Sequence, residues 1–124
     1  MKALFDTPIL RDYLYGKEDA RREIARYETP MISAITLTEL LLEVKGDEAE
    51  LVDGFLRSFQ IVPVSEEVAR EAAALELRHG VDTASALHWA AARTEDAIFV
   101  TRNKTAFPAY DPGVRFVGQL SREP

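Results

Sequence analysis

Five short apolar runs alternate with longer segments of helical periodicity, and this alternation constrains the fold more than any other feature of the chain. The runs are short enough to be buried strands, and strands that alternate with helices form a parallel sheet covered by helices. The sequence therefore predicts an α/β domain with a five-stranded parallel sheet. The expected strands are residues 3–5, 31–35, 61–64, 97–100 and 114–117. Pro63 inside the third strand indicates a position at the edge of the sheet.

The segments between the strands carry apolar residues at helical spacing. Ser65 has the side chain of a helix N-cap, and Glu66 and Glu67 follow it in the first turn, where acidic side chains are favourable. Gly80 is a natural residue to end that helix. The expected helices are residues 7–15, 17–27, 36–45, 47–59, 66–79 and 83–93.

Size, charge and cysteine content exclude several classes of protein. The chain has 124 residues, which predicts one domain spanning residues 1–124. Fifteen basic residues against 21 acidic ones give a net charge of −6, which argues against binding nucleic acid through bulk positive charge. Cysteine is absent, which excludes disulfides and thiolate metal sites. No apolar run approaches 18 residues, so we expect a cytoplasmic protein that does not enter a membrane.

Oxygen-bearing side chains follow the expected strands at the places where a parallel sheet binds ligands. Ligands of such sheets lie beyond the carboxyl ends of the strands, where the strand order reverses. Asp6 follows the first strand, Glu39 comes shortly after the second, and Asn103 follows the fourth. Glycine-rich phosphate-binding motifs are absent, and His88 has no partner that the sequence reveals. Carboxylates and amides suit a hard cation such as Mg²⁺ or Mn²⁺.

Four segments, in order along the chain, resemble the motifs of PIN-domain nucleases, the fold of VapC-type toxins. They are Leu4-Phe5-Asp6-Thr7, Ser33 to Leu40 with Glu39, Ser85 to Ala92, and Phe99 to Asn103 followed by Phe107. The resemblance covers nearly the whole chain. It implies a three-layer fold in which acids converge at the strand ends and hold one or two divalent ions.

The resemblance implies a Mg²⁺- or Mn²⁺-dependent endoribonuclease that cleaves RNA phosphodiesters. Asp6 and Glu39 match the family's acids and would hold the metal, and Ser85 and Asn103 would complete the catalytic site. Ser85 stands where the family has its third Asp, and Ala106 stands where some members place the fourth. These losses favour a weakened single-metal site. They also support the alternative of an inactive PIN-fold module that binds RNA or a protein partner.

The acidic candidates also have ordinary structural interpretations. Asp6 is placed to cap the helix that follows it, and Glu39 could close a capping box with Thr36. Asp82 could replace the lost acid, although a helix N-cap is the better interpretation. Glu43 lies one turn beyond Glu39 and could also supply the missing charge, although a solvated helix face is the simpler interpretation.

Binding partners are suggested by three basic residues and by one apolar helix. Arg11, Arg102 and Lys104 lie near the expected strand ends and could contact RNA phosphates, or could be ordinary solvated charges. Asn103 also has the side chain of a turn former. The helix at 36–45 is apolar almost all round, which indicates burial or a subunit interface. The resemblance implies a homodimer and an antitoxin-like protein partner.

Overall fold

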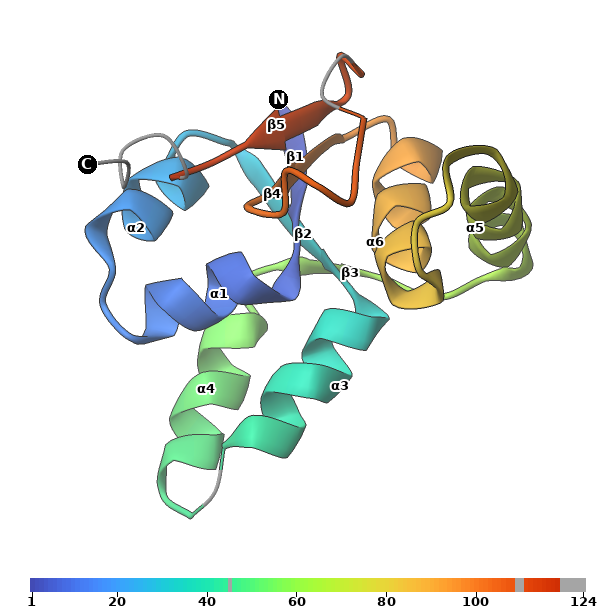
Figure 1. Ribbon diagram of the computed structural model, residues 1–124. Coiled ribbons are helices and arrows are strands. Elements are labelled where there is room, and N and C mark those ends of the chain that lie inside the picture. The colour runs from blue at the N-terminus through green and yellow to red at the C-terminus, as the bar shows by residue number, and fades with distance from the viewer. Residues whose placement is uncertain (45, 109–110, 119–124) are drawn as a thin grey trace.

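The computed structural model describes residues 1–44, 46–108 and 111–118. Its five strands form one sheet in the order β3-β2-β1-β4-β5, and every neighbouring pair is parallel (Figure 1). The predicted α/β class and parallel sheet are therefore confirmed. The strands are β1 (Lys2–Phe5), β2 (Thr29–Ser33), β3 (Gln60–Val62), β4 (Ile98–Thr101) and β5 (Val114–Phe116).

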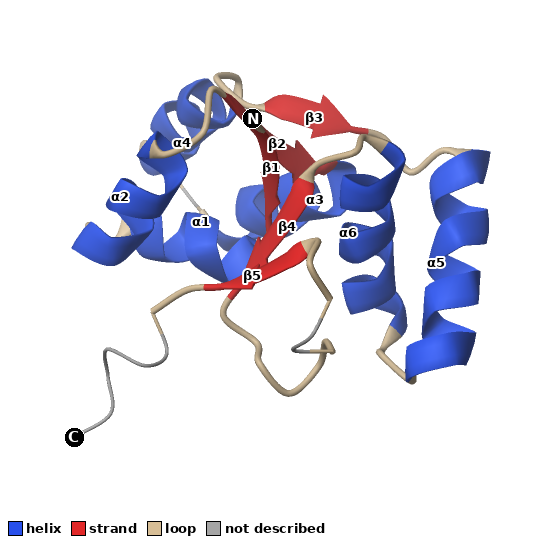
Figure 2. Ribbon diagram, turned by 90° about the horizontal axis from the view of Figure 1, so that it is seen from above, coloured by secondary structure: helices blue, strands red, loops and turns tan. Residues whose placement is uncertain are grey.

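Helices cover both faces of the sheet and make three layers (Figure 2). Leu4, Met31 and Phe99 of the strands pack with Trp89 and the other buried residues of α5 and α6. Phe5 and its neighbours on the other face pack against α1 to α4. The helices are α1 (Thr7–Leu14), α2 (Glu18–Ala25), α3 (Ala34–Glu43), α4 (Glu48–Leu56), α5 (Glu66–His79) and α6 (Thr83–Thr94).

The end of β2 differs from the sequence-based expectation, and the difference matters for the site. The strand stops at Ser33 because the Ser33 hydroxyl accepts a hydrogen bond from the Thr36 amide at 3.3 Å and caps α3. Helix α3 therefore begins at Ala34, two residues earlier than expected. The predicted capping box of Thr36 and Glu39 is wrong, since the cap is Ser33. The Glu39 carboxylate is available for other contacts.

Most other local expectations are confirmed. The hydroxyl of Ser65 caps α5, the carboxylate of Asp82 caps α6 by accepting from the Ser85 amide at 3.3 Å, and Gly80 ends α5 at φ +73°. Strand β3 lies at the edge of the sheet as expected, but it ends at Val62, so the prediction that Pro63 lies inside the strand is wrong. None of the described helices is long and apolar enough to cross a bilayer.

The strand order places a ligand crevice between β1 and β4. From β1 the chain builds β2 and β3 on one side, and it later returns to place β4 and β5 on the other. The strand order therefore reverses between β1 and β4, and residues that follow these two strands line the crevice where ligands bind in open α/β sheets.

Candidate active site

A pocket of about 220 Å³ occupies this crevice. It brings together all four predicted site residues from four different elements: Asp6 after β1, Glu39 on α3, Ser85 on α6 and Asn103 after β4. Arg11, Thr7 and His88 also line the pocket. Residues that are up to 97 positions apart in the chain thus share one cavity because parallel strands end at the same edge.

Asp6 lines this pocket, and one oxygen atom of its carboxylate makes no hydrogen bond within the described residues. Its residue is only 7% exposed, and the Thr101 hydroxyl donates to its Oδ2 atom. The side chain makes no cap bond to α1. Its Oδ1 atom is buried and has no hydrogen-bond partner among the described residues. Burial raises the pKa of Asp6 to about 6, although the Thr101 hydrogen bond, the nearby Ile9 backbone amide and the charges of Arg102 and Arg11 act in the opposite direction.

Glu39 is held at the pocket by a neighbour of Asp6. The Thr7 hydroxyl donates to Oε1 of Glu39 at 2.5 Å and lies 2.9 Å from the Thr36 hydroxyl. Thr7 is buried at the first turn of α1, whereas the Glu39 side chain is 43% exposed. The carboxylate thus faces both the pocket and solvent. The sequence analysis assigned no role to Thr7, although its place directly after Asp6 is a usable signal.

His88 is a second residue that the sequence analysis missed. It is 6% exposed, and its Nδ1 atom lies 2.8 Å from the Ser33 hydroxyl. Its Nε2 atom lies 4.0 Å from Oε1 of Glu39. The partner that the sequence did not reveal is therefore Ser33, which is 55 residues away in the chain.

Ser85 and Asn103 contribute neutral oxygen atoms at the pocket wall. Ser85 is half-buried in the first turn of α6. The side-chain oxygen of Asn103 accepts from the Thr105 hydroxyl at 3.0 Å and from the Ala106 amide at 3.2 Å. Asn103 therefore closes a turn beside the pocket, which agrees with the prediction that it is a turn former.

The three predicted RNA-binding residues have different surroundings. Arg11 lines the pocket and makes a two-pronged ion pair with Glu43, at 2.9 and 2.5 Å. Lys104 is exposed beyond β4. Arg102 lies outside the pocket, with its side chain only 14% exposed, and donates to Asp12 and Asp19. These half-buried partners hold its guanidinium, and Arg102 is not among the residues that line the pocket.

The two acids considered as replacements do not restore the missing charges. Glu43 is engaged by Arg11, which lowers the Glu43 pKa through a hydrogen bond. The Asp82 carboxylate caps α6, and its hydrogen bonds with Ser85 lower its pKa. Neither residue lines the pocket, which leaves Asp6 and Glu39 as its carboxylates.

Comparison with known proteins agrees with this architecture. The family model for the PIN domain matches residues 3–111. The chain belongs to the PIN-domain family. The resemblance expected from the four sequence motifs is thereby confirmed.

Solved structures also resemble this PIN domain over nearly its whole length. A toxin–antitoxin complex from Klebsiella pneumoniae contains a chain that is 30% identical, with 90% of this chain and 94% of that chain covered and a TM-score of 0.85. VapBC from Salmonella typhimurium bound to DNA matches at 24% identity, with coverages of 94% and 96% and a TM-score of 0.73. VapBC2 from Rickettsia felis bound to a promoter DNA fragment matches at 23%, with coverages of 94% and 97% and a TM-score of 0.72. No curated protein sequence matches significantly.

The donor set of this PIN domain fits one hard cation better than two. Its described residues contain no group of three or more acidic or histidine side chains arranged to hold a metal. Asp6 nevertheless offers a buried, unpartnered oxygen, and Glu39 adds a second carboxylate in the same pocket. Mg²⁺ is commonly held by one or two carboxylates and keeps several water ligands. The residues therefore fit a single Mg²⁺ or Mn²⁺ ion that retains much of its hydration.

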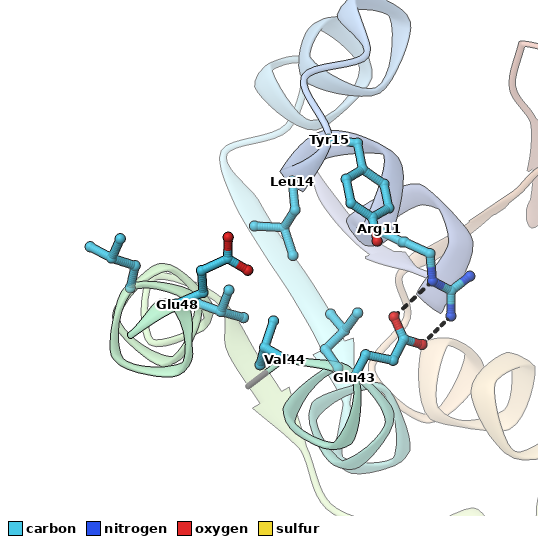
Figure 3. Close-up of a pocket in the computed structure, with 9 residues that line it drawn as sticks. Arg11, Leu14, Tyr15, Glu43, Val44 and Glu48 are labelled. Carbon is cyan, nitrogen blue, oxygen red and sulfur yellow. Dashed lines mark hydrogen bonds and ion pairs between the residues drawn. The ribbon is translucent and has the colours of Figure 1, made fainter. Parts of the chain in front are cut away.

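A second cavity of this PIN domain, about 340 Å³, lies between α1, α3 and α4 (Figure 3). The Arg11–Glu43 ion pair forms part of its wall, so Arg11 borders both cavities. Apolar side chains supply much of the remaining lining: Leu14, Leu40, Val44, Leu51 and Val52.

Proposed function

We propose that this PIN domain is a divalent-metal-dependent endoribonuclease of the VapC type with a reduced acidic site. Asp6 and Glu39 hold one Mg²⁺ or Mn²⁺ ion, and Ser85 and Asn103 complete the site. The observation that carries the proposal is the unpartnered Oδ1 atom of Asp6, which is buried in a pocket that Glu39 shares. An orphaned carboxylate oxygen is costly to bury, and a cation would compensate for that cost.

Other residues of the pocket orient the two carboxylates and position the RNA. A divalent ion, when bound, polarises a phosphodiester and activates water for in-line attack. The hydroxyls of Thr101 and Thr7 hold the carboxylates of Asp6 and Glu39 in place. Arg11 at the pocket wall and Lys104 nearby supply positive charge that positions RNA phosphates.

We also propose that the chain pairs with a second copy and with an antitoxin-like protein in the cytoplasm. The chain of the Klebsiella pneumoniae complex, which is 30% identical, supports such a partner. Helix α3 is not fully covered within the domain, because Leu41 is 40% exposed and Leu42 is 75% exposed. Large exposed apolar side chains that lie next to each other are typical of interaction surfaces.

Cleavage of RNA is expected to require a divalent ion and Glu39. Wild-type protein should cleave structured RNA with Mg²⁺ or Mn²⁺ and should lose this activity in chelator. Glu39→Gln keeps an oxygen that can accept from Thr7 but removes the charge, and it should lower the cleavage rate by about a hundredfold. Gel-based cleavage of a labelled RNA measures both effects.

Glu66→Gln is the matched control, since Glu66 is exposed on α5, on the opposite face of the sheet from α3. It removes the same charge and should cleave at the wild-type rate. Equal rates for the Glu39 and Glu66 variants, or cleavage that persists in chelator, would refute the metal-dependent mechanism.

The second candidate function is an inactive PIN module that binds RNA or a protein partner. The observation that favours it is Ser85, which adds a neutral hydroxyl where the family pattern has an acid. Ser85→Asp is expected to tighten Mn²⁺ binding and to raise cleavage by about tenfold, because a third carboxylate strengthens a hard-cation site. Ser58→Asp adds the same charge at an exposed position and serves as control. Cleavage by the Ser85 variant combined with none by wild type would establish the inactive module.

A further inference from the structure

Ser33, His88 and Glu39 form a line of polar contacts that no motif of the sequence indicates. The Ser33 hydroxyl lies 2.8 Å from Nδ1 of His88, and Nε2 of the same ring lies 4.0 Å from Oε1 of Glu39. The set has the residue types of a hydrolytic triad. Ser33, however, is 1% exposed and is already the N-cap of α3, so it cannot act as a nucleophile. These contacts among Ser33, His88 and Glu39 must therefore have a role other than nucleophilic catalysis.

The hydrogen bonds of Ser33 favour one of the two neutral forms of His88. The Ser33 oxygen accepts from the Thr36 amide at 3.3 Å, and its own proton is free to go to Nδ1 of His88. When that proton goes to Nδ1, Nδ1 is the acceptor and the neutral ring carries its own proton on Nε2. The other tautomer would direct a lone pair at the Glu39 carboxylate. Burial lowers the pKa of His88, against the opposing charges of Glu39 and Asp82, and so favours the neutral ring.

Glu39 needs a second restraint if its carboxylate is to stay in the pocket. Its side chain is 43% exposed and has three rotatable bonds, and Thr7 holds Oε1 through one hydrogen bond. A flexible side chain held at one point retains much of its conformational freedom, which must be lost on metal binding. Nε2 of His88, on α6, lies 4.0 Å from the same Oε1 atom, and His88 and Thr7 both line the pocket.

We infer that His88 is a positioning residue: Ser33 favours its Nε2–H tautomer, and that N–H, 4.0 Å from Oε1, attracts the Glu39 carboxylate that the Thr7 hydroxyl holds. The role in metal binding rests on the proposed function. The tautomer itself does not, since it follows from contacts within the metal-free protein. Supporting partners of metal ligands contribute about 10- to 100-fold to metal affinity.

Two substitutions of His88 distinguish the effect of its N–H donor from the effect of its ring. His88→Leu fills a similar space without a donor, whereas His88→Gln can place an amide N–H close to the position of Nε2. Mn²⁺ binding to each variant is measured by electron paramagnetic resonance, and thermal melting verifies that each variant folds. We expect the Leu variant to bind Mn²⁺ about tenfold more weakly than wild type, and the Gln variant to recover most of that loss.

Either of two results would overturn this role for His88: wild-type affinity in the Leu variant, or equal losses in the Leu and Gln variants. Asp6→Asn, measured alongside, tests the metal site itself. Unchanged Mn²⁺ affinity in that variant would refute the proposed function. Loss of affinity in it, together with no change in the Leu variant, would refute only the positioning role.

The tautomer is tested without metal by ¹⁵N NMR of the imidazole nitrogens in the intact protein. Wild type should show protonation at Nε2, and Ser33→Ala should shift part of the population to Nδ1–H because the donor to Nδ1 is gone. A wild-type ring protonated at Nδ1 would overturn the inference whatever the nuclease assays show.

Discussion

Asp6→Asn is expected to make the metal-free protein more stable while it removes metal-dependent cleavage of RNA. The carboxylate of Asp6 is buried with one oxygen unpartnered, so its charge costs folding free energy. Asn keeps an oxygen that accepts from Thr101 and carries no charge. The same change takes a charged ligand from the proposed metal site, and cleavage should fall by about a hundredfold or more.

The stability gain should depend on pH with a defined sign. The pKa of Asp6 is about 6 in the folded protein, compared with 3.8 for the ordinary side chain. Well below pH 3.8 the carboxyl of Asp6 is protonated in both the folded and the unfolded state, and its burial has no pH-dependent cost. As pH rises from about 4 to about 6 the unfolded chain loses this proton first, so stability falls by about 3 kcal/mol and stays low above that range.

The measurement is urea unfolding of wild type and Asp6→Asn in chelator between pH 4 and pH 7. The difference between the two proteins isolates Asp6, because other shifted carboxylates, such as Glu23, are present in both. Asp53→Asn, at an exposed carboxylate, should show neither the pH-dependent gain nor the loss of cleavage. A variant that is no more stable than wild type at pH 7 would contradict the proposed cost of burying Asp6.

Arg102→Met is expected to lower the free energy of unfolding by about 3 kcal/mol. Its guanidinium donates to Asp12 on α1, to Asp19 on α2 and to the Val117 carbonyl just after β5. Removing one partner from a largely buried charge network leaves the other charges uncompensated, which is strongly destabilising. Chemical denaturation measures the loss.

Arg57→Met is the matched control for that substitution. Arg57 pairs with Asp53 on the surface of α4, with its side chain 78% exposed, and such pairs contribute about 0.5 kcal/mol. If Arg102→Met proved as stable as the Arg57 variant but bound RNA poorly, Arg102 would be a phosphate ligand, as its place after β4 first suggested. The contacts in the structure favour the loss of stability.

The sheet could be predicted from the sequence because its central strands β1 and β4 are buried over most of their length and are mainly apolar. Asp6 could be found for the same reason, since a polar residue directly after such a strand lies at the ligand-binding edge. The environment of Glu39 could not be predicted from the sequence. It depends on the cap at Ser33, which competed with an equally plausible cap at Thr36.

Sequence patterns could not predict the direction of a side chain that is held by a residue far away in the chain. Arg102 follows β4 as expected, but carboxylates 83 and 90 residues away determine where its guanidinium lies. His88 acquires its role from Ser33, which is 55 residues away. Local spacing carries no information about such pairs, because the fold brings them together.

Arg11 makes the two cavities thermodynamically dependent on each other. Its guanidinium is paired with Glu43 in the wall of the α1–α3–α4 cavity, and its charge also lowers the proton affinity of Asp6. A ligand of that cavity that draws Glu43 aside changes the electrostatic potential at Asp6, and so changes its affinity for a cation. By reciprocity, a cation at Asp6 changes the affinity for that ligand by the same factor.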